Sequence, residues 1–431
     1  MAEYKQYVNL DPSKPDEINE IKSRRTGTYI MLVAKLNKKV EGVPIIFDIK
    51  PGTNNIDKRK IRKRRVTDKS GNAKLLFQVS KNGGDEWTFE AFIKRKSGKK
   101  GKVLVSDKYI VWRRIYYQIS RFKSGPRGRG RTDPTPLWEI PNFDWTPIKN
   151  EFKDRHHNIE LIDDSSIDLI TRRCNILMSD EDYKKSAREG YNSKREPVCM
   201  RVVLVNMIAE KGAFNYFFGT VVENKPIIKD IGRYLWIDES NEIKKDFLIS
   251  AEWRYYSGSD TSWKPLDPKY IDSVGSHRIR INNQNIPKKW FLDIFGERKA
   301  MIRLKLNVLK SSTNGVSWYN SIWIAHENMH KGLRPISQKQ ATTVHETGHF
   351  IGMVPAGQST HYTGHGHQGS HCSTGLSTVD KTKSTYKGLS GTCVMFGEGG
   401  SGSSRKNNFC NKCDPSVRTR SVIISKMPTN W

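Results

Sequence analysis

The sequence has no apolar run that approaches the ~20 residues a membrane-spanning helix requires. Its longest apolar segments, such as Val202-Val203-Leu204-Val205, have the length of a β-strand. The first residues, Met-Ala-Glu-Tyr-Lys-Gln, lack the apolar segment of a secretory signal. We therefore expect a chain without a membrane span that is made in the cytoplasm without a signal peptide. If it acts elsewhere, a separate system secretes it or delivers it into a target cell.

Acidic residues are scarce. There are 45 Asp and Glu against 74 Lys and Arg, which gives a net charge of +29, and residues 1–131 alone carry +20. Three clusters stand out in this part of the chain, at residues 58–65, 94–102 and 127–131. Such clusters attract nucleic acid, anionic cell-wall polymers or an acidic protein. Solvated basic loops that only keep the protein soluble are an equally good interpretation.

What the sequence does contain is the segment His345-Glu346-Thr347-Gly348-His349. Helical residues four apart share one face, so His345 and His349 can bind one metal ion while Glu346 lies beside it. Two imidazoles and one further ligand leave a fourth zinc position for water, whose pKa falls toward ~7. Glu346 is then the base that takes the proton of this zinc-bound water. The pattern predicts a zinc peptidase.

The flanking residues favour a helix around this motif. Pro335 suits a first turn, and Ile336, Ala341 and Val344 have the spacing of a buried face. Gly352 permits a left-handed turn that ends the helix and returns the chain toward the metal. His326 and His330, just before the helix, are interpreted as a solvated pair.

A third ligand is missing at the usual distance, because Pro355 stands where a metzincin has its third histidine. Downstream, a glycine-rich segment carries four histidines close together. One of them is expected to complete the site. The candidates are His361, His365, His367 and His371.

Together with the residues that follow, this order resembles the archaemetzincin branch of the metzincins. The matching positions are His345, Glu346, His349, Gly352, the pair His371-Cys372, Cys393, Met395, Cys410 and Cys413. The resemblance implies that His371 is the third ligand of the catalytic zinc and that Met395 forms the methionine turn beneath it. It also implies that the four cysteines bind a second, structural zinc. The chain departs from the family because His371 lies 22 positions after His349, whereas in the pattern the third histidine lies six positions after the second.

The four cysteines also have metal-site character independently of any family. Thiolates that end in a Cys-x-x-Cys pair can close a tetrahedral site around zinc. Two disulfides are the alternative, and they require an oxidising compartment. Cys174 and Cys199 are interpreted as buried small hydrophobic residues.

The amino-terminal third has the pattern of β-structure. Segments 28–34, 43–49, 73–79 and 87–93 are short, rich in β-forming residues and separated by turn residues. The phrases at 42–49 and 66–75 resemble bacterial Ig-like repeats of the invasin type. We therefore predict an all-β Ig-like sandwich at residues 1–120, a linker rich in Gly, Pro and Arg at 121–148, and a zinc metallopeptidase domain at 149–431.

The fold expected for the catalytic domain is an α+β zincin. Residues 159–178 have the spacing of a helix, whereas 198–208 and 301–309 read as strands. Side chains at residues 317–325 alternate strongly in character just before the motif helix. In zincins a strand of this kind lies above the cleft, and a peptide substrate can pair with its edge. Tyr362 is a weak candidate for a residue that stabilises the oxyanion.

The function that follows is zinc-dependent hydrolysis of peptide bonds, with two zinc ions per chain. The expected substrate is a polypeptide or a cell-wall peptide of peptidoglycan. The modular organisation resembles toxins and effectors of contractile bacterial secretion systems, whose partners include a secretion apparatus or an immunity protein. The alternatives are a DNA-associated protease anchored by the basic amino-terminal domain, and a non-enzymatic protein in which both zinc ions are structural.

Overall fold

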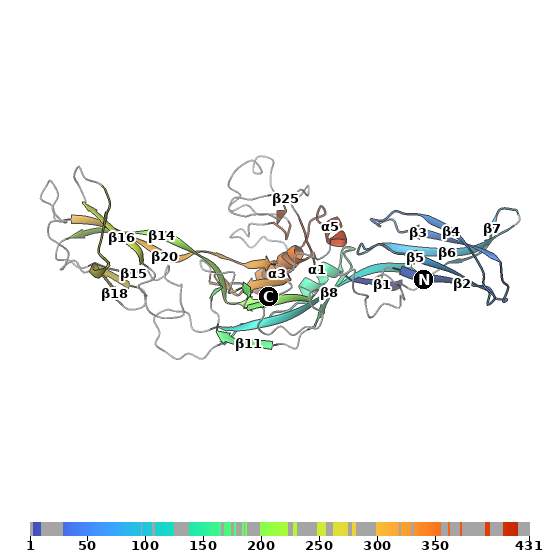
Figure 1. The fold of residues 1–431 in the computed structure, drawn as a ribbon, viewed down its shortest axis with the longest axis horizontal. Helices are drawn as coiled ribbons and strands as arrows, with labels where there is room; N and C mark the ends of the chain where they lie inside the picture. The colour runs from blue at the N-terminus through green and yellow to red at the C-terminus, as the bar shows by residue number, and fades with distance from the viewer. Residues whose placement is uncertain are drawn as a thin grey trace.

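The protein is described from a computed structural model. The described residues are 3–9, 29–95, 97–105, 108–124, 138–164, 168–173, 176–177, 183–184, 186–187, 199–222, 227–230, 248–255, 262–274, 278–281, 299–318, 320–328, 332–354, 361–362, 371–372, 393–396 and 408–420. They form an elongated molecule with strands at both ends and the longest described helix, α3 (Ile336–Phe350), in the middle (Figure 1). None of the helices in these ranges has the length and apolar content to cross a bilayer.

Within the described residues the largest sheet has twelve strands, and its main path runs β21-β22-β13-β8-β6-β3-β4. Five further strands pair with two members of this path: β1, β9, β10 and β11 with β8, and β7 with β6. The bounds are β1 (Glu3–Asn9), β3 (Pro44–Pro51), β4 (Ile61–Val66), β6 (Glu86–Lys94), β7 (Lys100–Val105), β8 (Lys108–Ser124), β9 (Trp138–Glu139), β10 (Ile159–Asp163), β11 (Asp168–Arg173), β13 (Cys199–Val205), β21 (Gly315–Trp318) and β22 (Ser321–Ala325).

The amino-terminal part is a two-layer β-structure. Strands β2 (Tyr29–Lys35) and β5 (Asn72–Gln78) form an antiparallel pair whose alternate side chains are buried against β3 and β6. Trp87 and Phe89 lie in this core, each edge-to-face with Phe77. The strands predicted at 28–34, 43–49, 73–79 and 87–93 are confirmed to within two residues, because alternating apolar residues specify a half-buried strand locally.

Strand β8 belongs to both the amino-terminal and the central part. Its first residues pair with β6 and β1, and its later residues pair with β10, β13, β11 and β9. Val111 lies in the amino-terminal core, whereas Ile115, Tyr117 and Ile119 lie in the central core. The boundary predicted at residue 120 therefore falls inside a continuous strand.

The prediction of a helix at residues 159–178 is wrong. The segment contains β10, β11 and β12 (Ile176–Leu177), and the burial of Ile159 and Leu161 follows the two-residue period of a strand. The segment forms strands because β8 lies beside it. Strands β10 and β11 pair in parallel with β8 and make their main-chain hydrogen bonds with it. The alternating segment 317–325 is also not one strand but parts of two, β21 and β22, which form an antiparallel hairpin.

The described strands between β13 and β21 form a long β-arm that projects from the centre (Figure 1). Its axis is the antiparallel pair β14 (Met207–Val222) and β20 (Lys299–Thr313). Strand β20 confirms the strand predicted at 301–309, whereas the strand predicted at 198–208 is divided between β13 and β14, which belong to different sheets. The other strands of the arm are β15 (Ile227–Asp230), β16 (Leu248–Tyr255), β17 (Lys264–Pro265), β18 (Ile271–Val274) and β19 (Arg278–Ile281), with a short 3-10 helix η2 (Pro268–Tyr270).

Helices are few in the described residues. Besides α3 and η2, the structure describes α1 (Thr146–Lys153), α5 (Asp414–Thr419) and the helical residues 183–184 and 186–187. Helix α3 packs against β21, β22 and α1. The remaining short strands are β23 (Glu327–Asn328), β24 (Gly332–Leu333), β25 (His361–Tyr362) and β26 (His371–Cys372). The central core thus lies between the parallel strands and α3, and the motif residues of α3 lie next to the sheet.

Candidate metal centre

Helix α3 carries the motif as predicted and begins directly after Pro335. Ala341 and Val344 are buried, but Ile336 is 57% exposed, so its predicted place on the buried face is wrong. The reason is its position in the first turn, which extends beyond the sheet that covers the rest of the helix. From Lys339 to Gly348 every residue is buried, including His345 and Glu346.

The helix ends in the glycine turn that the sequence predicts. Gly352 has φ of +75°, in the left-handed region. Its N–H donates to the carbonyl of His349 and the N–H of Met353 donates to that of Gly348, both at 2.9 Å. This pair of bonds is the Schellman motif, which closes a helix and reverses the chain. The turn directs the chain away from the helix axis immediately after His349.

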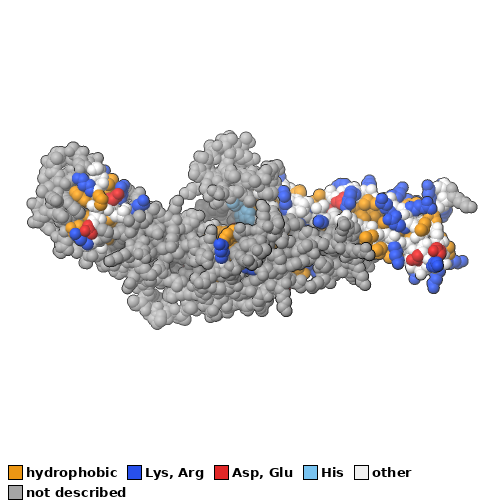
Figure 2. Space-filling view, in the orientation of Figure 1, with side chains coloured by type: hydrophobic (Ala, Val, Ile, Leu, Met, Phe, Trp, Pro, Cys, Tyr) orange, Lys and Arg blue, Asp and Glu red, His pale blue; other side chains and the backbone are white. Residues whose placement is uncertain are grey.

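Three histidines converge at this end of the helix. The Nε2 atoms of His345 and His349 are 3.0 Å apart, and one ring nitrogen from each of these residues and from His371 lies within 4.8 Å of the others. His345 donates from Nδ1 to the carbonyl oxygen of Val394 at 2.6 Å, so its Nε2 carries the lone pair. His349 and His371 are half-buried, and histidine side chains are visible at the surface in the middle of the molecule (Figure 2).

The described part of the segment that leads to His371 consists of two short paired strands. Strands β25 and β26 pair antiparallel, with His361 opposite Cys372 and Tyr362 opposite His371. Among the four candidate histidines, His371 is the one that the described residues place with His345 and His349. His365, His367 and the side chains of His361 and Tyr362 lie outside the described residues.

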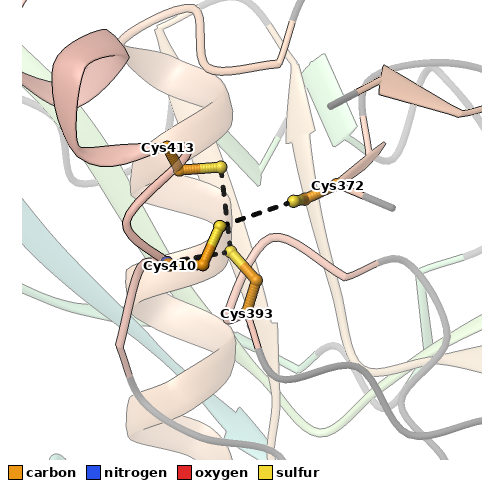
Figure 3. Close-up of side chains that lie close together, drawn as sticks. All are labelled: Cys372, Cys393, Cys410 and Cys413. Carbon is orange, nitrogen blue, oxygen red and sulfur yellow. Dashed lines mark hydrogen bonds between the residues drawn. The ribbon is translucent and has the colours of Figure 1, made fainter. Parts of the chain in front are cut away.

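The four cysteines form a second group (Figure 3). The Sγ atoms of Cys372 and Cys410 are 3.8 Å apart, and so are those of Cys393 and Cys413. Four sulfurs at ~2.3 Å from a tetrahedral zinc lie about 3.8 Å from one another, whereas a disulfide requires about 2.05 Å. The described cysteines are free thiols. The spacing therefore has the geometry of a metal site and not of the alternative, two disulfides.

The surroundings of this group also favour a bound cation. Hydrogen bonding with the Cys372 thiol, followed by other thiols of the group and burial, raises the pKa of Cys393 and of Cys413. Cys393 and Cys413 are therefore neutral as free thiols, and they ionise together only when a positive charge compensates them. The N–H of Cys410 points at Cys393 Sγ at 3.4 Å. This backbone donor stabilises negative charge on the sulfur.

One short turn connects the two groups. In the turn at 393–396, Cys393 supplies a sulfur, Val394 holds His345 through its carbonyl, and Met395 accepts a hydrogen bond from the N–H of Cys372 at 2.8 Å. Cys372 directly follows His371. Both histidine positions are therefore fixed through residues that also build the cysteine group.

Met395 packs against helix α3. It is fully buried, and a Cβ placed on Gly348 would lie 2.4 Å from its Sδ. Gly348 is thus required for close packing and not for a positive φ. The glycine within the motif makes room for the side chain of Met395.

We expect Gly348→Ala to destabilise the protein by about 1–2 kcal/mol, because overpacking costs more than the ~1 kcal/mol that alanine gains in a helix. Urea unfolding measures the change. Met395→Ala should cost less stability in the Gly348→Ala background than in the wild type, since it removes the clash. Additive effects of the two substitutions would contradict the packing argument.

Glu346 lies against strand β21. A Cβ placed on Gly315 would be 2.8 Å from Glu346 Oε1 and 2.5 Å from Thr342 Cγ2. Arg334, itself buried, donates to the carbonyls of Asn314 and Ala325 and to Thr342 Oγ1, at 2.8, 2.6 and 2.6 Å. This guanidinium joins the start of β21 to α3 and so fixes the distance between Glu346 and the strand.

The structure also bears on the predictions for His326, His330 and the two cysteines outside the group of four. His326 is not solvated but 6% exposed, and its Nδ1 lies 3.1 Å from Lys339 Nζ, because it follows β22 directly into the core. His330 and Cys174 lie outside the described residues. Cys199 is buried in β13, as expected.

Residues that no short sequence pattern singles out hold the cysteine group in place. Glu151 of α1 accepts hydrogen bonds from Phe409 N–H and Asn408 Nδ2, at 2.8 and 2.7 Å, just before Cys410. Burial raises the pKa of Glu151, and these hydrogen bonds oppose that shift. Arg113 of β8 donates to the carbonyls of Val417 and Arg418 in α5. No local pattern could reveal partners more than 250 positions apart.

No family model, curated protein or solved structure matches the chain. The interpretation of the site therefore depends on its geometry and on the chemistry of its residues.

Proposed function

We propose that the protein is a zinc-dependent metallopeptidase that hydrolyses peptide bonds with Glu346 as general base. One observation carries this proposal. Three histidine nitrogens, from two elements separated by a long insertion, lie within 4.8 Å of one another next to a buried glutamate of the same helix. A chance pair of surface histidines does not bring a third histidine with it.

The residues fit a zinc ion. Two ring nitrogens on a tetrahedral zinc are about 3.3 Å apart, and the Nε2 atoms of His345 and His349 are 3.0 Å apart. The hydrogen bond from His345 to Val394 is the outer contact that sets the tautomer of a metal-binding histidine. Three protein ligands leave an open position, which is typical of catalytic zinc, whereas the four cysteines form a closed, structural set. When bound, the catalytic zinc supplies Lewis-acid chemistry that activates water and the substrate carbonyl.

Glu346 carries the proton transfers in this proposal. Its carboxylate takes a proton from the attacking water and passes it to the amide nitrogen that leaves. The side chain is 5% exposed, and a buried position next to the sheet limits its motion. Its neighbours Gly315 and Thr342 restrict it to the side of the helix that faces β21.

Strand β21 is suited to hold an extended substrate. It is the terminal strand of the large sheet and pairs, among the described strands, with β22 only. A peptide that adds to this edge gains main-chain hydrogen bonds. Gly315 would then bring the substrate backbone next to Glu346. The substrate class that we infer is an extended polypeptide or a peptide of peptidoglycan.

We expect Gly315→Ala to lower kcat/KM at least about tenfold while zinc content stays unchanged, because its Cβ would displace the Glu346 carboxylate and a small misplacement is costly in catalysis. Peptidase assays and metal analysis of the same sample measure both. Ser317→Ala, two residues along the same strand, is the matched control and should change kcat/KM less than about threefold. Equal losses in the two variants would contradict a specific role of Gly315.

The assignment of the third ligand is tested with His371→Ala and His361→Ala. We expect the first to lose one of two zinc ions and all measurable peptidase activity, because two imidazoles alone hold zinc weakly. The second should keep both zinc ions and the activity. Metal analysis together with hydrolysis of denatured protein and of peptidoglycan fragments gives the answer. Retention of both zinc ions in His371→Ala would sink the proposed site.

A further inference from the structure

Strand β4 is the end strand of the large sheet on the amino-terminal side. It pairs with β3, and no other described strand pairs with it. Its residues 62–66 are all exposed, so both faces of the strand are open to solvent. Figure 2 shows Lys and Arg side chains gathered over this end of the molecule. An edge strand presents a row of main-chain donors and acceptors to whatever lies beside it.

The positive charge of β4 is only partly neutralised within the protein. Asp48 and Glu90, on neighbouring strands, form ion pairs with Arg62, Lys50 and Lys100. Hydrogen bonding with Arg62 lowers the pKa of Asp48, and hydrogen bonding with Lys50 lowers that of Glu90, so both acids are charged at neutral pH. Five exposed cations remain without an ion pair among the described residues. They are Lys58, Lys60, Lys63, Arg64 and Arg65.

The arrangement excludes one common occupant of a free edge. Lys63 and Arg65 lie on one face of β4 and Arg64 on the other, because side chains alternate along a strand. A second copy of the chain that paired edge to edge would place these cations opposite one another, which is destabilising. A strand with acidic residues on both faces meets opposite charge on both faces instead.

We propose that β4 binds an acidic, extended peptide segment of a partner protein by strand addition. The main chain of the segment pairs with the free edge of β4, and its carboxylates lie opposite Lys63, Arg64 and Arg65. Cross-strand neighbours of opposite charge have Cβ atoms about 4.5–5.5 Å apart, within reach of ion pairing. This surface is separate from the proposed metal centre, so it requires no assumption about catalysis.

A peptide explains the arrangement better than a phosphate polymer does. Nucleic acid binds basic residues through phosphates and needs a positive groove or stripe, but it makes no ladder with a strand edge. β4 combines a free edge with cations on both of its faces. The two occupants differ in one measurable respect, because only strand addition depends on the amide groups of the ligand.

The test uses the full chain and a fluorescein-labelled peptide, Gly-Thr-Glu-Glu-Val-Glu-Glu-Thr-Gly. A second peptide has the same sequence with alternate amides N-methylated, which keeps its charge and blocks strand pairing. The protein variants are Lys63→Glu with Arg65→Glu, and the control Lys38→Glu with Lys39→Glu. The control pair is also exposed and changes the net charge equally. Fluorescence anisotropy at fixed salt measures the affinities, with a 12-base-pair DNA duplex as competitor.

We expect the variant at residues 63 and 65 to bind the peptide at least about tenfold more weakly than the wild type, and the control variant less than about threefold. N-methylation should weaken binding to the wild type by a similar factor. Equal loss in both variants would overturn the proposal, as would an N-methylated peptide that binds as well as the first. A duplex that binds at β4 while the peptide does not would make this a nucleic-acid surface instead.

Discussion

Glu346→Gln is expected to reduce peptide hydrolysis at least about a thousandfold while both zinc ions stay bound. General base catalysis contributes about 10²–10⁴ to a rate, and the amide of glutamine cannot accept the proton of water. The substitution preserves the volume of a side chain that is buried against Gly315 and Thr342. Steady-state kinetics and metal analysis of the same preparation separate loss of the base from loss of the metal.

The matched control is Glu160→Gln on β10, which removes an equal charge from a half-exposed glutamate paired with Arg114. Its activity should remain within about twofold of the wild type, because Glu160 is partly exposed and is not part of the proposed metal centre. Substantial hydrolysis by Glu346→Gln would refute the proposed mechanism. Loss of zinc together with activity would show that Glu346 acts on the structure of the site and not on the proton.

Cys393→Ala is expected to remove the structural zinc and to weaken zinc binding by the histidines about 10–100-fold. The first effect follows because a tetrahedral thiolate site with three ligands is open to water and to chelators. The second follows because the turn that carries Cys393 also holds His345 through Val394 and joins Met395 to Cys372. Loss of a hydrogen bond that orients a metal-binding histidine typically lowers metal affinity about 10–100-fold. Metal analysis across a chelator titration measures both effects.

Cys199→Ala is the control for this experiment, because Cys199 is an equally buried thiol in β13 and not part of the cysteine group. It should retain both zinc ions. In the reverse experiment, His345→Ala with His349→Ala should leave one zinc per chain, held by the cysteines. A protein that binds no zinc after the histidine substitutions would count against an independent cysteine site.

Much of the metal centre follows from short sequence patterns. The spacing of His345, Glu346 and His349 needs only the period of a helix to place these residues on adjacent positions of one face. Gly352 ends that helix because a residue without Cβ adopts positive φ at no steric cost. The strands of the amino-terminal part could be predicted equally well, since each alternates apolar and polar residues over its own length.

Patterns of this kind were misleading wherever tertiary pairing overrode them. The helical spacing at 159–178 gives way to strands because β8 offers a parallel partner. Residues 317–325 look like one alternating strand, yet they fold back as a hairpin. Ile336 is apolar and has the right spacing, but it lies in the turn of α3 that extends beyond the sheet.

The sequence by itself determined the helix that carries His345, Glu346 and His349 and the glycine that ends it, because these depend on neighbours a few positions apart. It also supplied the four cysteines as candidate metal ligands. Only the tertiary structure decided which histidine joins His345 and His349, and that sulfurs 3.8 Å apart have metal-site geometry. It alone placed Gly315 against Glu346. Such contacts join segments that are tens to hundreds of positions apart in the sequence. Their distances are set by how the sheet, the helix and the turn at 393–396 pack together. A short sequence pattern carries no information on this packing.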